Sequence, residues 1–148
     1  TSDNVAKRQG PALGLCALCN VVEGANHVFF QCPLARFAWS AVREAAGASW
    51  DPRSSTELTQ ILNLVQGSCK RVLWACVGAL FWALWLTRNK IAIEKVFPTH
   101  PANIIFKCII FLQQWSPLAR HKDADQMQQA QDRLRHVYEK AREPATTP

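Results

Sequence analysis

Four residues near the start of the chain have the types and spacing of a metal site. They follow one another as Cys16-x2-Cys19-x7-His27-x4-Cys32. Two thiolates separated by two residues can curl around one ion, and the following loop can bring an imidazole and a third thiolate to complete a tetrahedron, which is the geometry that zinc prefers. Four protein ligands leave no coordination position for water, so the pattern predicts one structural Zn²⁺ rather than a catalytic one.

The alternative interpretation takes Cys16 and Cys19 as a redox pair and His27 as a surface residue. A redox CxxC usually opens a helix within a βαβ unit, whereas Gly14 precedes this one and a polar loop, 20–26, follows it. The sequence therefore favours zinc. The remaining cysteines lie in apolar helical surroundings, where free cysteine behaves as a small hydrophobe, and they are Cys69, Cys76 and Cys108.

No set of residues in the chain is typical of catalysis. There is no P-loop, no nucleophile elbow and no HExxH, and the 11 acidic residues include no carboxylate pair spaced for two-metal chemistry. His100 precedes a proline at a helix start, and His121 and His136 lie in polar stretches, so each is expected at the surface. We therefore expect that this chain is not an enzyme.

The elements that must position the four ligands are helical. Apolar spacing, caps and breakers predict helices over 33–46, 54–66, 69–95, 101–116 and 123–141. The fold is predicted to be mostly α: a small CCHC zinc knuckle, with a possible short β-hairpin from 21–22 and 28–30, leads into a Trp-rich domain of four to five helices. The expected division is 1–47 (knuckle and following helix), 48–120 (apolar helical domain), 121–143 (polar amphipathic helix) and 144–148 (disordered tail).

The third predicted helix contains an uncharged run, 72–86, with Trp74, Trp82 and Trp85 on roughly one face. This run is shorter than the roughly 20 residues that cross a bilayer, so we expect a buried central helix and no membrane partner. Tryptophan can also stack on bases in single-stranded nucleic acid, but in so apolar a helix the core is the favoured place for these rings.

Charge gives a weak indication of the partner. Lys and Arg outnumber Asp and Glu by 17 to 11, for a formal net charge of +6, but the cations are dispersed, and solvated helix faces explain them as well as a nucleic-acid site does. The first hypothesis is that cations flanking the zinc contact phosphates of RNA or DNA, and they are Lys7, Arg8, Arg36 and Arg43.

The second hypothesis is a protein-interaction module without a nucleic-acid role. The polar last helix carries an apolar stripe that could pack on the core, pair with a protein partner or support self-association, and it includes Met127, Leu134 and Val137. The cysteine usage and the lack of a visible signal peptide favour a reducing, intracellular location, in the nucleus or cytoplasm.

The chain resembles the zinc-binding region of plant non-LTR (LINE-type) reverse transcriptases, the zf-RVT family. The similarity rests on CxxC at Cys16, Glu23 shortly before His27-Val-Phe-Phe, Cys32-Pro and Trp39, and on a later WxLWxxRNK that ends at Lys90. It covers about residues 3–97. The resemblance implies a retroelement-derived zinc module that handles nucleic acid, with the same four ligands. Catalytic residues of the polymerase or of RNase H have no counterpart in this sequence.

Overall fold

A computed structural model describes residues 14–144, and nearly all of the regular structure in this part of the chain is helical. The α-helices are α2 (Pro33–Ala46), α3 (Ser55–Leu64), α4 (Gly67–Asn89), α5 (Asn103–Trp115) and α6 (Ala124–Arg142). Short helical turns are η1 (His27–Gln31), η2 (Lys90–Glu94), η3 (Ser116–Leu118) and η4 (His121–Asp123). The mostly helical fold predicted from the sequence is confirmed.

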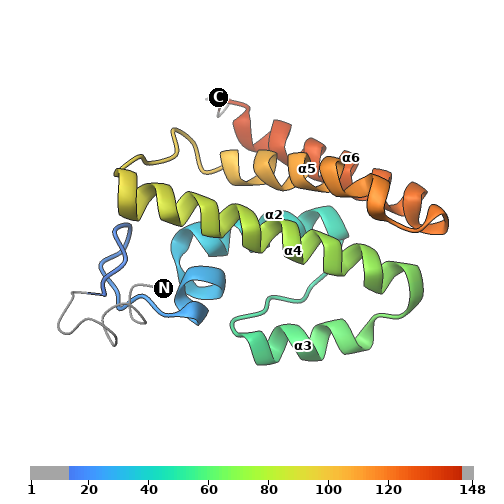
Figure 1. Cartoon of the computed structure of the whole chain (residues 1–148), viewed down its shortest axis with the longest axis horizontal. Coiled ribbons are helices and arrows are strands. Elements are labelled where there is room, and N and C mark those ends of the chain that lie inside the picture. Colours follow the sequence, from blue (N-terminus) through green and yellow to red (C-terminus); the bar gives the residue numbers. More distant parts are fainter. Residues whose placement is uncertain (1–13, 145–148) are drawn as a thin grey trace.

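Helix α4 is central to the arrangement (Figure 1). It crosses in front of α2 in this view, α5 and α6 lie along one side of it, and α3 lies on the other side. The chain from residue 14 to η1 lies beneath the C-terminal end of α4. Buried side chains from Cys16 to Val137 form one continuous core, so the segment that carries the four predicted ligands, the apolar helices and the last helix share it.

Local sequence signals account for the helix ends. Pro33 is the first residue of α2, and Gly47 ends that helix in the left-handed region at φ 62°, where glycine has no steric penalty. Ser54 caps α3, because its Oγ accepts a hydrogen bond from the amide of Glu57 at 3.2 Å. Helix α2 has the predicted ends, and α3 begins as predicted but ends at Leu64, two residues earlier than expected.

The predicted β-hairpin is not formed. Within residues 14–144, extended chain pairs only at an isolated antiparallel bridge between Leu15 and Val22. The segment 28–30 was expected as a strand because it is β-branched and aromatic, but it lies in the single π-helical turn η1. Val28 and Phe30 are buried there, so tertiary packing has overridden local β propensity, and this prediction was wrong.

Helix α6 packs on the core through its apolar stripe, which the sequence alone also allowed as a binding site for a protein partner. Met127, Leu134 and Val137 are all buried, and α6 contacts α2, α4 and α5. Gln131 is buried among them and donates a hydrogen bond to Ser116 Oγ at 2.7 Å. In this structure the side chains of the stripe are therefore buried against the other helices of the same chain. Of the predicted tail, Pro144 is described and 145–148 lie outside the described residues.

The long central helix differs from its prediction in one respect. Helix α4 and η2 run on from Gly67 to Glu94, and by length and composition alone this stretch could cross a membrane, a test that core helices of soluble proteins also pass. Trp74 is 54% exposed and Trp82 is 47% exposed, so the expectation that they belong to the core was wrong. Trp85 is half-buried.

Candidate metal centre

The structure brings the four predicted ligands together. One ligand atom from each of them lies within 4.8 Å of all the others, and we call this set, Cys16, Cys19, His27 and Cys32, the CCHC cluster. Cys16 Sγ lies 3.9 Å from Cys32 Sγ, and Cys19 Sγ lies 3.2 Å from His27 Nε2. Cys19 is half-buried and the other three residues are buried. The residues therefore lie close enough to bind a metal ion.

Backbone hydrogen bonds shape the loop that carries the first two ligands. The Cys16 amide donates to the carbonyl of Val21 at 2.8 Å, and the Asn20 amide donates to the carbonyl of Cys16 at 2.8 Å. Asn20 takes the left-handed conformation at φ 60°, which asparagine tolerates better than most residues. The chain reverses here, and both thiols come to the same side of the loop.

The other two ligands lie at the two ends of one turn. His27 is the first residue of η1, and the Cys32 amide donates to the His27 carbonyl at 2.8 Å. Cys32 is also the N-cap residue of α2. The third thiol is therefore fixed to the start of a helix that is itself part of the core.

Burial makes the thiolate form of these cysteines unfavourable without a cation. It raises the pKa of the Cys32 thiol to about 12, an effect that the Leu34 amide opposes and the neighbouring Cys16 thiol strengthens. Burial likewise raises the pKa of Cys19. A bound divalent cation reverses this preference, since metal-coordinated thiols are deprotonated.

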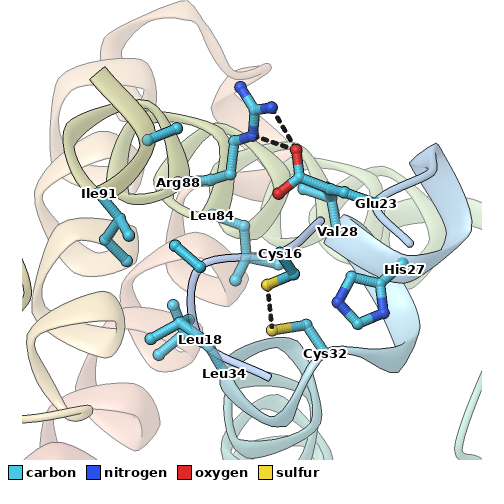
Figure 2. A pocket seen from close by; sticks show the side chains of 12 residues that line it. Cys16, Leu18, Glu23, His27, Val28, Cys32, Leu34, Leu84, Arg88 and Ile91 are labelled. Carbon is cyan, nitrogen blue, oxygen red and sulfur yellow. Dashed lines mark hydrogen bonds and ion pairs between the residues drawn. The ribbon is translucent and has the colours of Figure 1, made fainter. Parts of the chain in front are cut away.

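A buried ion pair connects the ligand loop to α4. Arg88 binds Glu23 through both Nε and Nη2, with the Nε bond at 2.7 Å, and the two side chains are 17% and 4% exposed (Figure 2). Both residues line a cavity of about 30 Å³ together with Cys16, His27 and Cys32. Figure 2 shows the imidazole of His27 close to the side chains of Cys16 and Cys32. The loop is thereby held against the C-terminal end of α4.

Trp39 supports the turn that carries His27. Its indole is 1% exposed, Nε1 donates to the carbonyl of Phe29 at 2.7 Å, and its ring stacks on Phe30 with centroids 5.8 Å apart. The ring of Phe81 from α4 packs edge-on against both aromatic rings. Turn η1 is therefore clamped between α2 and α4.

Arg36 and Arg43, two of the cations expected to contact phosphates, form ion pairs within the protein. Arg36 binds the Asp51 carboxylate and donates to the carbonyls of Phe30 and Pro52, each at 3.2 Å. Arg43 Nη1 and Arg53 Nη2 lie 3.3 Å and 3.1 Å from the same carboxylate. The Arg36 hydrogen bond, more than the other cations, lowers the pKa of Asp51. Arg36 thus acts mainly as a structural residue. Lys7 and Arg8 lie outside the described residues.

Sequence reasoning did not identify the supporting residues as a set. Glu23, Trp39 and Arg88 appeared only as letters of the resembled motifs, with no role attached. The sequence assigns Asp51 no role, and no local spacing indicates its three arginine neighbours. The available signals were a glutamate that follows the CxxC loop and an arginine at the end of an apolar helix.

Comparison with known proteins adds no family assignment. No protein-family model matches the chain, and neither the curated proteins nor the solved structures include a significant match. The fold and the site define a helical protein with a CCHC cluster, and the function must be argued from these features.

Proposed function

We propose that the CCHC cluster binds one Zn²⁺ ion and that this ion is structural. With zinc–sulfur bonds of about 2.3 Å, the sulfur–sulfur edge of a regular tetrahedron is about 3.8 Å. The Cys16–Cys32 distance of 3.9 Å agrees with that edge. The Cys19–His27 distance of 3.2 Å is shorter than the corresponding sulfur–nitrogen edge of about 3.6 Å, so this pair would separate slightly on binding.

The donor set determines what such an ion would do. Three thiolates and one imidazole fill the four positions of zinc, and no position is left for a reacting water or substrate. The ion would then fix residues 16–32 against the core, and its binding energy would contribute to folding. This is a non-catalytic role. The observation that carries the proposal is the convergence of the four ligand atoms within 4.8 Å.

Metal analysis of matched variants tests the zinc proposal. We expect one zinc per chain, lost in Cys19→Ser and in His27→Ala but retained in Cys69→Ser, because Cys69 is an exposed cysteine outside the cluster. Co²⁺ in place of zinc should give thiolate charge-transfer absorption and the visible bands of a tetrahedral ion. Stoichiometric zinc in both ligand variants would remove the proposal.

We further propose that this module is retroelement-derived and binds nucleic acid. The two motifs that resemble the zf-RVT family, around Glu23 and around Arg88, are joined by the buried ion pair, which is consistent with their being parts of one unit. The net charge of +6 favours a polyanionic partner. Binding of a labelled single-stranded oligonucleotide should weaken steeply with salt, and no binding at low salt would refute this function.

A protein-interaction role is the second candidate, and exposed aliphatic side chains favour it. Leu64, Ile93 and Leu118 are 84%, 76% and 85% exposed. Such side chains can mark contacts with other proteins when they form patches. Size-exclusion chromatography coupled to light scattering distinguishes this role from the first. Self-association or a stable complex, with no oligonucleotide binding, would favour it.

A further inference from the structure

Helix α4 exposes an aromatic surface that the fold does not cover. Trp74 and Trp82 are each about half exposed, although the helix around them is apolar. They are eight residues apart, or about 12 Å along the helix axis. Figure 1 shows α4 on the near side of the molecule, with α2 behind it.

A third indole lies against α4 midway along the helix between these two residues. Gly78 lies four residues from each, and the ring of half-buried Trp115, from the end of α5, lies 3.6 Å from the position that a Cβ on Gly78 would occupy. The ring of Trp115 therefore lies within contact distance of the Gly78 position on α4. We call Trp74, Trp115 and Trp82 the aromatic row.

The charged side chains of α4 are all positive, and Lys70 and Arg71 are one helical turn from Trp74, whereas Arg88 lines the cavity of the CCHC cluster. Residues Gly67–Asn89 contain Lys70, Arg71 and Arg88 and no acidic residue. Arg71 is paired with Asp123 and Arg88 with Glu23, but both carboxylates are only 4% exposed, whereas Arg71 is 35% exposed. The guanidinium of Arg88 also lies 5.6 Å from the ring centroid of Trp85. Solvent therefore meets tryptophan rings and cationic groups on this helix, while the balancing acids are buried.

Exposed tryptophan rings next to cations fit one kind of binding partner best. A second copy of the chain would bring like charges together if two α4 faces met. The large apolar residues exposed on α4 are both tryptophans, and the strongly exposed aliphatic residues Leu64, Ile93 and Leu118 lie on other elements. The exposed apolar surface of this helix is therefore aromatic rather than aliphatic. Aromatic rings beside cations match the bases and phosphates of a single strand.

We propose that the aromatic row is a stacking platform for the bases of single-stranded RNA or DNA, with Lys70 beside the phosphates. The inference rests on the proposed nucleic-acid function and moves its site from Arg36 and Arg43 to α4. Binding here would depend little on base sequence, since every base has a face that can stack.

Fluorescence anisotropy with a labelled 12-nucleotide mixed-sequence strand tests the platform on the zinc-loaded protein. Trp74→Ala and Trp82→Ala should each weaken binding by about 5- to 150-fold, the range for loss of one base–aromatic stack. Their salt dependence should stay unchanged, whereas Lys70→Ala should reduce the salt slope by about 1. Phe106→Ala is the matched control, because Phe106 is also 47% exposed but lies on α5.

Three results separate the outcomes. If the wild-type chain binds but the two tryptophan variants bind equally well, the platform is wrong and the nucleic-acid function stands. If the wild-type chain does not bind at low salt, both fail. If the variants lose self-association instead of oligonucleotide binding, a second copy is the occupant and the platform is again overturned. Trp82→Phe, which keeps a ring, should retain most of the affinity, and unchanged zinc content confirms that each variant is folded.

Discussion

Replacement of Arg88 should destabilise the protein more than replacement of its partner Glu23. Arg88→Met leaves a carboxylate that is 4% exposed without its guanidinium, and breaking a buried pair in this way costs about 3–5 kcal/mol of unfolding free energy. Glu23→Gln keeps a hydrogen-bond acceptor for Arg88. The Arg88 guanidinium is also 17% exposed, still donates to Asn89 Oδ1 at 3.0 Å and still lies over the ring of Trp85. We expect a smaller cost there, about 1–3 kcal/mol.

Urea unfolding of the zinc-loaded protein, followed by tryptophan fluorescence, measures these costs. For a chain of this size, the loss in Arg88→Met corresponds to a Tm lower by about 6–20 °C. The double variant should cost less than the sum of the single variants, because each single change strands a charge that the double change removes. Lys140→Met is the control, since its ion pair with Glu44 is exposed and should contribute little. Equal effects of Arg88→Met and Lys140→Met, or additive single variants, would refute the buried anchor.

Three further predictions use other parts of the structure. In the zinc-loaded protein Cys69 should be the one thiol that reacts quickly with Ellman's reagent, and chelation should raise the number to four as the cluster thiols are released; four fast thiols before chelation would contradict this. The hydrogen bonds from Arg71 hold the pKa of Asp123 well below its usual range, so the stability they give is complete above the unfolded pKa of about 3.9 and is lost as the pH falls further. Asp123→Asn should therefore flatten the acid-unfolding curve by circular dichroism below about pH 4, and an unchanged curve would oppose this reasoning. Gly78→Ala should raise the unfolding free energy by about 1 kcal/mol, because alanine favours helix and its Cβ would meet Trp115 at an ordinary contact distance of 3.6 Å; a lower Tm would show that the ring cannot accommodate it.

The parts of this protein that sequence predicts well are those governed by nearby residues. The CxxC turn, the proline after Cys32, the Ser54 cap and the glycine at position 47 act within a few residues of the structure they determine. The ligand set belongs to this group as well, because all four ligands lie between residues 16 and 32 and their convergence needs one loop and one turn.

The parts that escaped prediction depend on distant partners. Glu23 and Arg88 are 65 positions apart, and Asp51 meets Arg36 across 15 positions, so no local spacing reports either contact. Helix α4 raises a different difficulty. Its residues are apolar nearly all round, so no periodicity reveals which rings face solvent, and Trp74 was expected on the wrong side.

Cys32 is both a member of the CCHC cluster and the N-cap residue of α2, and this restricts where the chain can tolerate insertions and deletions. One residue inserted between Cys32 and Trp39 would turn the thiol by about 100° around the α2 axis relative to the indole that clamps η1. The ligand geometry and the aromatic clamp could not then both be kept. Related chains should therefore keep the number of residues from Cys32 to Trp39 unchanged.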